Sequence, residues 1–312
     1  MSSDTRVRVI LNPSAASGLA LHKVGEIGDA LRRYELRHEI VLTRARGHAA
    51  ELARAARADG ADVIAVVGGD GTLNEVVQAY VGDDGEPIAG PGLAVIPCGT
   101  GGDFRKTLGM SGALDEAVAR IRHGTRRAVD LGVLCITGHD GELKTHAFVN
   151  IASFGIGGQV DAIVNDSPKW LGGKTAFFVG TLRAMASYKN ASVRVKVDGT
   201  TWFEGPIFNV AIANGRYFGG GMMIAPHADP SDGRFEVVAI GDLSRGEVIG
   251  LTGKIYKGAH LASDGVRVTH GTRIEAEAVH PWATVLADVD GEQPGKLPLR
   301  ASILKGALTF CG

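Results

Sequence analysis

The sequence has few cysteines, few aromatic residues and almost no net charge. Its three cysteines, Cys98, Cys135 and Cys311, are odd in number and far apart. This spacing argues against a disulfide framework and predicts a reducing, cytoplasmic setting. The formal net charge of -1 gives no overall field that would favour nucleic acid as a partner. No apolar stretch approaches the roughly 20 residues of a membrane helix and no signal precedes the first strand, so we expect a soluble protein.

Glycine is the residue that the chain has in excess. It accounts for 45 of the 312 residues, against a usual share of about 7%. Many backbone positions must therefore turn tightly or approach another group closely. The ten histidines, by contrast, show no metal-ligand spacing, and we interpret them as surface or core residues.

Strands and helices alternate in the first third of the chain. Branched apolar runs predict strands, and apolar residues at helical spacing predict the helices between them. Strands separated by helices form a parallel sheet with right-handed crossovers, and such sheets bind ligands at the carboxyl ends of their strands. The predicted strands are 6–13, 37–43, 62–67 and 92–97, and the predicted helices are 21–34, 48–58, the segment after Thr72, and 112–123.

The pattern changes after about residue 125. Short alternating segments separated by glycine turns favour an antiparallel sandwich, interrupted by predicted helices at 169–188 and 244–256. The predicted strands are 125–135, 145–151, 192–197, 207–213, 235–240, 266–268, 272–278, 284–289 and 298–304. We place the domain boundary at residue 130. The prediction is an α/β nucleotide-binding domain over 1–130 and a β-rich domain over 131–312, whose C-terminal strand is free to return to the first domain.

Two glycine-rich segments follow neighbouring predicted strands. Segment 68–75, GGDGTLNE, and segment 97–104, PCGTGGDF, each carry a hydroxyl and an acid. Glycines at a strand end let backbone N–H groups approach an anion, and the following helix points its positive end the same way. The pair therefore indicates a site for a nucleoside triphosphate with its metal. A tight turn with an incidental aspartate is the alternative interpretation of a single such segment.

Neither common nucleotide fingerprint is present. Gly99-x-Gly101 continues to Phe104 where a dinucleotide motif requires glycine. Segment 168–175, PKWLGGKT, ends like a Walker A loop, but Pro168 stands in place of the first glycine and no strand precedes it. We interpret this segment as the start of a helix.

The two glycine-rich segments, together with VDLG (129–132), APHADPSDGRFEV (225–237) and VDGE (289–292), resemble the motifs of bacterial soluble diacylglycerol kinases and their lipid-kinase relatives. That family is related to sphingosine kinases and NAD kinases. GGDGT is shared with NAD kinases and, more loosely, with phosphofructokinases, whereas the later motifs separate the lipid kinases. The resemblance covers nearly the whole chain. It implies an NAD kinase/phosphofructokinase-like α/β domain, a C-terminal β-sandwich-like domain, and ATP bound in the cleft between them.

The resemblance also implies roles for individual residues. Asp70 would anchor the Mg²⁺ that bridges the phosphates, Asp130 would be a second active-site acid, and Glu292 would be the general base for the acceptor hydroxyl. The Asp-Gly pair before Glu292 is also a common hairpin signal, which leaves a plain β-turn as the alternative. ATP would contact Asn12, Thr43, Gly68, Gly69, Asp70, Gly71, Thr72, Asn74 and Thr100.

Segment 229–234, DPSDGR, places two acids around a proline and a glycine. Carboxylate and carbonyl oxygens of such turns suit hard cations. By resemblance, a structural Mg²⁺ or Ca²⁺ would be held by the carboxylate of Asp232 and the carbonyls of Asp229 and Arg234. A solvated turn is the alternative.

Two positions depart from the family's usual pattern. Gly102 stands where the family has Asn, and Arg105-Lys106 stands where it has Ala-Arg. Lys106 keeps the positive charge of the family's arginine but lacks the planar, forked set of donors of a guanidinium group. These departures bear on details of substrate and nucleotide, and they remove none of the three proposed catalytic acids.

The sequence therefore predicts an ATP- and Mg²⁺-dependent kinase of a lipid hydroxyl, with diacylglycerol as the first candidate. A kinase of a soluble polyol or nucleotide is one alternative, and a lipid- or nucleotide-binding regulator without catalysis is another. We expect a peripheral, reversible contact with the inner face of the membrane, through apolar side chains of 169–185 or 216–223. We expect no nucleic-acid partner, and a homodimer stays open.

Overall fold

The structure is a computed structural model that describes residues 5–98, 102–156 and 190–312. The chain divides into two compact units. Unit 1 comprises Met1–Leu131 and Lys305–Gly312, and unit 2 comprises Gly132–Leu304. Two long strands, β5 (Arg126–Gly138) and β17 (Glu292–Cys311), contribute residues to both units. The division within β5 falls beside the predicted boundary at residue 130, and the last residues of the chain belong to unit 1.

Unit 1 contains a parallel sheet in the order β2-β1-β3-β4-β17. The C-terminal strand joins beside β4, where Phe310 lies opposite Leu93. Branched and apolar side chains fill β3 along its whole length, and all six of its residues are buried. The predicted parallel α/β architecture is confirmed. The first four strands are β1 (Arg6–Leu11), β2 (Arg37–Leu42), β3 (Val63–Gly68) and β4 (Gly92–Pro97).

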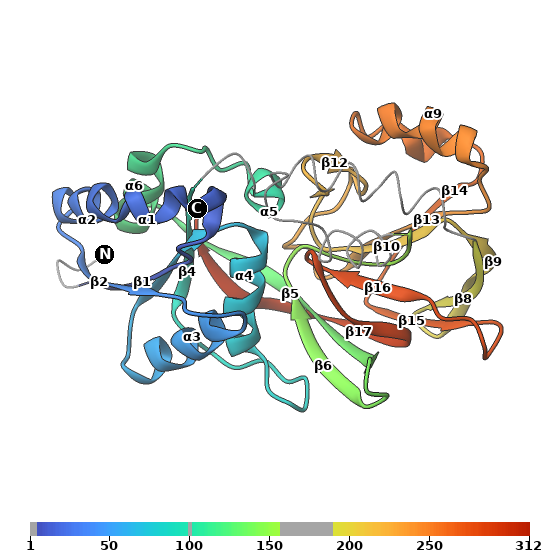
Figure 1. The fold of residues 1–312 in the computed structure, drawn as a ribbon, viewed down its shortest axis with the longest axis horizontal. Coiled ribbons are helices and arrows are strands. Elements are labelled where there is room, and N and C mark those ends of the chain that lie inside the picture. The colour runs from blue at the N-terminus through green and yellow to red at the C-terminus, as the bar shows by residue number, and fades with distance from the viewer. Residues whose placement is uncertain (1–4, 99–101, 157–189) are drawn as a thin grey trace. The chain divides into compact units, whose positions relative to one another are not determined.

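Helices cover both faces of this sheet (Figure 1). Alternate side chains of β1, such as Val9, share a core with Leu31 of α2 and Val118 of α6. The opposite face, which includes the buried Ile64, is covered by α3 and α4. The helical segments are η1 (Ala15–Gly18), α1 (Leu19–His22), α2 (Val24–Arg33), α3 (His48–Ala58), α4 (Asp70–Val77), η2 (Gln78–Tyr80), α5 (Asp103–Thr107) and α6 (Leu114–His123).

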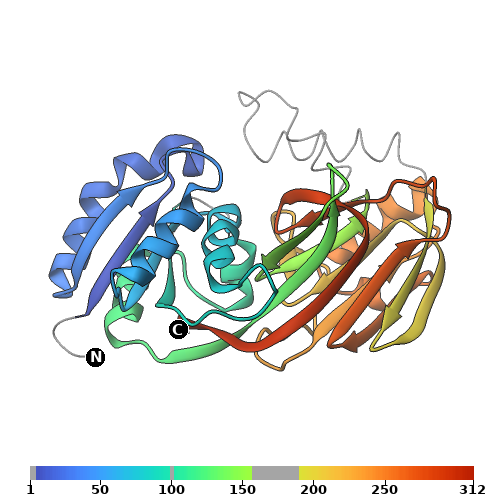
Figure 2. The same cartoon turned by 90° about the horizontal axis from the view of Figure 1, so that it is seen from below.

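Unit 2 is a sandwich of antiparallel strands around one large apolar core. One sheet has the order β14-β13-β10-β7-β16, and a second contains β9-β8-β15. Strand β17 pairs with β16 and with β15, and it also pairs with β5, which in turn pairs with β6 (Figure 2). Side chains from both sheets, such as Phe154, Phe235 and Ile274, meet in the core. The remaining strands are β6 (Leu143–Phe148), β7 (Ile151–Gly155), β8 (Ala191–Val197), β9 (Thr200–Ile207), β10 (Asn209–Ala213), β13 (Phe235–Ile240), β14 (Val266–Gly271), β15 (Arg273–Ala278) and β16 (Leu286–Val289).

Helix α9 (Arg245–Ile255) covers the outer face of β10 and β13, where Leu251 and Ile255 join a smaller apolar cluster. It begins with a capping box between Ser244 and Glu247, which satisfies N–H groups at the start of the helix. A short hairpin, β11 (Tyr217–Phe218) and β12 (Met222–Met223), and a 3₁₀ turn, η4 (His260–Ala262), complete the unit. The predicted helix 169–188 lies outside the described residues. Among the described helices, none is long and apolar enough to span a membrane.

Candidate active site

The carboxyl ends of the parallel strands of unit 1 carry most of the predicted nucleotide residues. Leu11 lies opposite both Leu42 and Val67, so the three strands end level with one another. The residues just after β1 and β2 are hydrogen-bonded to the neighbouring strand ends. Asn12 N donates to Val67 O (3.0 Å), and Thr43 N donates to Leu11 O (2.9 Å). The structure therefore brings Asn12, Thr43 and the start of α4 to one edge. Thr100 lies outside the described residues.

Glycine is needed at position 68 for a different physical reason than at positions 69 and 71. A Cβ on Gly68 would stand 2.6 Å from the Cβ of Thr72 and nearer still to its hydroxyl, so the packing of α4 against β3 requires glycine there. Gly69 and Gly71 are exposed, and apart from their chain neighbours and the backbone of their own helix, no atom of the described residues lies within 4 Å of the place of their missing Cβ. Packing therefore does not explain these two glycines. An open backbone at a helix start suits the close approach of an anion.

Three polar side chains lie at or beside the carboxyl ends of β1 and β3: Asn12, Thr72 and Asn74. Asn12 Nδ2 donates to Thr72 Oγ1 (3.2 Å), and Asn12 Oδ1 accepts from Ser14 N (3.0 Å). Both Thr72 and Asn74 are buried, and Gln78 Nε2 donates to the Asn74 carbonyl (2.9 Å). The bond between Asn12 and Thr72 holds the start of α4 beside the end of β1. Contact of Asn12, Thr72 and Asn74 with ATP stays a prediction.

Asp70 joins the two glycine-rich segments. Its Oδ2 accepts from Asp103 N (2.7 Å), and its Oδ1 accepts from Phe104 N (3.3 Å). Burial raises the pKa of Asp70, and the hydrogen bond from the Asp103 N–H opposes that rise. Asp103 itself is buried and pairs with Lys106 Nζ at 2.7 Å. The carboxylate of Asp70 is therefore the side chain that fixes the spacing between the two strand exits.

A small pocket lies between these strand exits. Its walls come from the end of β3, the start of α4, strand β4 and the segment that leads into α5. The lining residues are Gly68, Gly69, Asp70, Leu73, Val95, Pro97, Gly102 and Arg105. Among its lining residues are a carboxylate, Asp70, a cation, Arg105, and three glycines of the two strand exits.

Asp130 lies on β5 with its side chain 1% exposed. Its Oδ1 accepts from Gly306 N (2.7 Å) on β17, where Gly306 has a φ of 62°. This bond fixes β5 to β17 within unit 1, and a role of Asp130 as an active-site acid stays a prediction.

Glu292 is the first residue of β17 and is half-buried. It follows a two-residue hairpin turn in which Asp290 and Gly291 have φ values of 52° and 86°, as a type I′ turn requires. Asp288 Oδ1 accepts from Gly291 N (2.9 Å). The hairpin alternative is thus correct for the turn itself. The role of Glu292 as the general base is a separate question and stays a prediction.

The carboxylate of Asp290 is a structural clamp that the sequence interpretation missed. It accepts from the N–H groups of Val149 (2.9 Å), Asn150 (3.2 Å) and Ile151 (2.8 Å). The turn that presents Glu292 is therefore tied to the segment before β7. Asp-Gly in VDGE pointed only to a turn, and nothing in the sequence indicated the partner segment.

The predicted cation loop forms a self-contained turn. Asp232 Oδ1 accepts from Arg234 N (3.0 Å), and Asp232 Oδ2 accepts from Arg234 Nε (2.8 Å). The Asp229 carbonyl accepts from Asp232 N (3.3 Å). Its oxygen donors suit Mg²⁺ or Ca²⁺ in kind, but the guanidinium of Arg234 competes for the carboxylate. No group of three acidic, histidine or cysteine side chains converges as a metal site within the described ranges.

We expect Asp232→Ala to abolish any thermal stabilisation that Mg²⁺ gives in the absence of nucleotide. A cation bound only to the folded state raises the unfolding free energy by mass action, by about 2.7 kcal/mol at 100 times its dissociation constant. Calorimetric melting with and without Mg²⁺ measures this response. Asp70→Ala is the matched control and should retain it. If Asp232→Ala responds to Mg²⁺ as the wild type does, segment 229–234 is a solvated turn.

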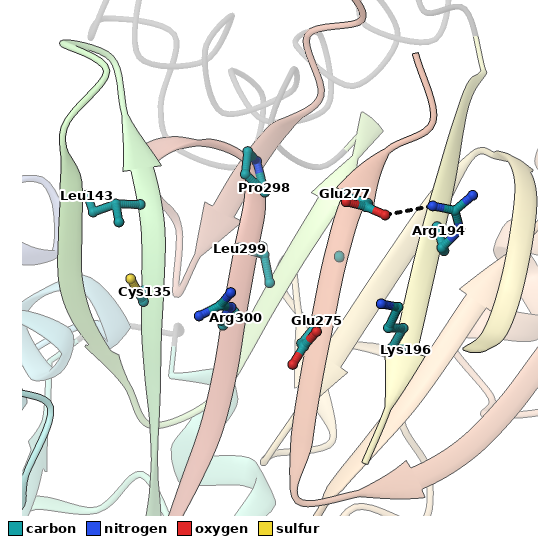
Figure 3. A pocket seen from close by; sticks show the side chains of 10 residues that line it. Cys135, Leu143, Arg194, Lys196, Glu275, Glu277, Pro298, Leu299 and Arg300 are labelled. Carbon is teal, nitrogen blue, oxygen red and sulfur yellow. Dashed lines mark hydrogen bonds and ion pairs between the residues drawn. The ribbon is translucent and has the colours of Figure 1, made fainter. Parts of the chain in front are cut away.

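A larger hollow of about 280 Å³ lies on the outer face of the second sheet of unit 2 (Figure 3). Charged side chains alternate across its strands: Arg194 Nε pairs with Glu204 Oε2 and Arg194 Nη1 with Glu277 Oε1, both at 2.8 Å. None of the predicted site residues lines it. The remaining lining residues are Cys135, Leu143, Lys196, Glu275, Ala276, Pro298, Leu299 and Arg300.

Of the two segments predicted to contact a membrane, only 216–223 lies within the described residues, and its large apolar side chains are not exposed. Tyr217, Phe218, Met222 and Met223 are half-buried, and Phe218 and Met222 pack on the cluster beneath α9. Trp170, Phe177 and Phe178 lie outside the described residues. The most exposed large apolar side chains in the described part of unit 2 are instead Trp282 (80%), Leu143 (69%) and Tyr256 (51%).

Comparison with known proteins matches both halves of the chain. Residues 6–134 match the family described as "Diacylglycerol kinase catalytic domain". Residues 150–312 match the "YegS C-terminal NAD kinase beta sandwich-like domain". The fold and the glycine-rich strand exits therefore define a kinase-type protein: a parallel α/β domain followed by an NAD kinase-like β-sandwich domain.

Relatives of similar length agree with this assignment. A diacylglycerol kinase of Mycobacterium tuberculosis is 29% identical over 310 residues, covering 97% of this chain and 94% of the relative. A diacylglycerol kinase of Bacillus subtilis is 26% identical over 297 residues, covering 94% and 91%. A crystal structure of a diacylglycerol kinase from Bacillus anthracis has a TM-score of 0.72 at 22% identity, covering 100% and 98%. The chain belongs to the diacylglycerol kinase and YegS-like lipid kinase family.

Proposed function

We propose that this chain transfers the γ-phosphoryl group of ATP to the free hydroxyl of diacylglycerol and so forms phosphatidic acid. The observation that carries the proposal is the exit of β3, where Gly69 and Gly71 leave the backbone open beside Asp70. This arrangement is what a phosphate group needs for close contact with backbone N–H groups. Its place in a chain whose two halves both match lipid kinase domains supports a phosphoryl donor there.

The reaction needs positioning, charge neutralisation and a proton acceptor. In the proposed mechanism, Glu292 accepts the proton of the lipid hydroxyl, whose oxygen forms a bond to the γ-phosphorus. The bond between that phosphorus and the bridging oxygen of ADP breaks, and ADP leaves. Mg²⁺ bound with ATP supplies charge neutralisation of the phosphates. Asp70 is the residue that would hold this cation, since each of its oxygens accepts one backbone N–H and retains a further lone pair.

The acceptor determines where the protein works. A molecule with two acyl chains has essentially no aqueous concentration, so we propose a reversible, peripheral association with the inner face of the membrane. A few exposed apolar side chains with neighbouring cations give such binding, which strengthens with anionic lipid and weakens with salt.

The test is a comparison of acceptors under one set of conditions. With labelled ATP and Mg²⁺, we expect phosphorylation of diacylglycerol in mixed micelles or anionic vesicles to exceed that of soluble polyols and nucleosides. Raising the salt concentration should lower the rate on vesicles more than the rate on micelles, because vesicle binding has an electrostatic part. Greater activity on a soluble alcohol than on every dispersed lipid would replace this proposal with a soluble-substrate kinase.

A further inference from the structure

Two departures from the family pattern, Gly102 and Arg105, lie together in the small pocket at the exit of β3. Gly102 has a φ of 108°, a conformation that favours glycine. A Cβ at this position would stand 3.3 Å from Arg105 Nε and 3.4 Å from Arg105 Cβ. A side chain at 102 would therefore push against the arginine. The glycine and the arginine form one structural arrangement rather than two independent substitutions.

Lys106, which occupies the position of the family's usual arginine, is committed elsewhere. Its Nζ pairs with Asp103 Oδ1 at 2.7 Å, and the Asp103 side chain is only 8% exposed. A short ion pair with a buried carboxylate neutralises the ammonium group and fixes its direction. Lys106 therefore does not bring a free positive charge to the pocket.

Arg105 does bring one. Its Nη1 donates to the carbonyl of Met110 (2.6 Å), whereas its Nε is buried and has no hydrogen-bond partner. No carboxylate in the described part of the chain pairs with it. Asp70, which lines the same pocket, accepts from the N–H groups of Asp103 and Phe104 and makes no ion pair with Arg105.

A second arginine outside the pocket, Arg120, also has an unpaired donor. Arg120 Nη2 is also buried without a partner, and Arg120 Nη1 is 4.0 Å from Glu116 Oε2. Burial lowers the pKa of Arg120, and the charge of Arg105 is among the further causes. Buried N–H groups are paired in the great majority of cases. Arg120 does not line the pocket, so the buried Nε of Arg105 is the donor there that has no acceptor among the described residues.

We propose that Arg105 is the cation that contacts the nucleotide phosphates at the Gly68–Gly69 strand exit, in place of the residue at 106. The inference rests on the proposed ATP-dependent function. Guanidinium is suited to this task because its donors match phosphate oxygens in pairs. Gly69, whose missing Cβ leaves open space, lines the same pocket as Arg105.

The test compares Arg105→Gln with Arg127→Gln. Arg127 Nη1 donates to the carbonyl of Leu108 (3.0 Å), so both variants remove a bond from an arginine to the same α5–α6 connection. The dissociation constant for ADP with Mg²⁺ is measured by calorimetry, and melting temperatures show that each variant is folded. We expect Arg105→Gln to weaken ADP binding about 10-fold to 100-fold, the scale of a lost charge-assisted hydrogen bond. Arg105→Lys should give an intermediate value, and Arg127→Gln should bind ADP like the wild type.

The outcomes separate this inference from the proposed function. If Arg105→Gln binds ADP with the same dissociation constant as the wild type, the role of Arg105 is overturned and the kinase proposal stays in place. Equal weakening in Arg105→Gln and Arg127→Gln also overturns it, because the effect then comes from the connection that both arginines hold. A wild-type protein that binds no ADP or ATP contradicts the nucleotide site itself.

Discussion

Replacing Glu292 with Gln should reduce turnover by about 10²-fold or more while nucleotide affinity stays near that of the wild type. This is the usual range for loss of a positioned general base, because the amide cannot accept the proton of the lipid hydroxyl. Glu292 and Gln have the same shape, and the position is half-buried at the start of β17, so the fold should tolerate the change. Steady-state kinetics with diacylglycerol micelles, together with calorimetric binding of ADP, measure the two quantities separately.

Asp290→Asn is the matched control two residues away. Its carboxylate accepts three backbone N–H groups, so its replacement should lower the melting temperature of the protein. We expect its remaining turnover, measured below that temperature, to exceed that of Glu292→Gln. Wild-type turnover in Glu292→Gln would refute the assignment of the general base and leave the hairpin as a turn alone.

Asp70→Asn should lower the rate with Mg·ATP on the order of 10²-fold, the scale reported for removal of one group that stabilises transition-state charge. The variant should nevertheless fold. An asparagine oxygen can still accept the shorter bond from Asp103 N, and only the 3.3 Å bond from Phe104 N is lost. Initial rates at several Mg²⁺ concentrations test whether the loss belongs to the metal and its phosphates. Full activity at ordinary Mg²⁺ concentrations would show that Asp70 is only a spacer between the two segments.

The pH dependence of stability gives an independent check on Asp70. Burial raises its pKa in the folded state, from an ordinary value of about 3.9. At pH values between the pKa of Asp70 in the unfolded chain and its raised pKa in the folded protein, the folded protein binds more protons than the unfolded chain. The unfolding free energy therefore falls as pH rises through this range. Asp70→Asn has no such proton. We therefore expect urea titrations to show a smaller fall in stability from about pH 4 upward in the variant than in the wild type.

Periodicity predicted the elements of unit 1 closely because its central strands, β1 and β3, are rich in buried branched residues and its helices α2, α3 and α6 are amphipathic. Helix α3 and strand β4 have the predicted bounds, 48–58 and 92–97. Helix α5 was missed because five residues are too few for a helical period to show. The predicted helix 21–34 is divided at Lys23 into α1 and α2.

In unit 2, strands that carry charge on their outer face were harder to recognise. Strand β9 (Thr200–Ile207) was missed, since its alternation is broken by Gly205 and Pro206. Strand β17 was predicted only over 298–304, whereas it runs over twenty residues. Strand β7 was missed because its five buried residues, IASFG, show no alternation.

For the candidate site, motif spacing predicted which segments meet but not what each side chain does. The strand exits with Asn12, Thr43 and Gly69 lie at one edge, as the rule for parallel sheets requires. The same glycine-rich motif, however, combines Gly68, which packing demands, with Gly69 and Gly71, which packing does not explain. Sequence spacing cannot separate these cases, because the contact between Gly68 and Thr72 exists only once α4 has folded against β3.

Single-turnover transfer from γ-labelled ATP tests the central claim most directly. The protein is mixed with a limiting amount of labelled ATP, Mg²⁺ and diacylglycerol in mixed micelles, and the organic phase is analysed for the labelled lipid. The account predicts that the label moves to phosphatidic acid in the wild type and does so at least about 10²-fold more slowly in Glu292→Gln. Label that stays in ATP, or that appears only as inorganic phosphate or on a soluble alcohol, would contradict it.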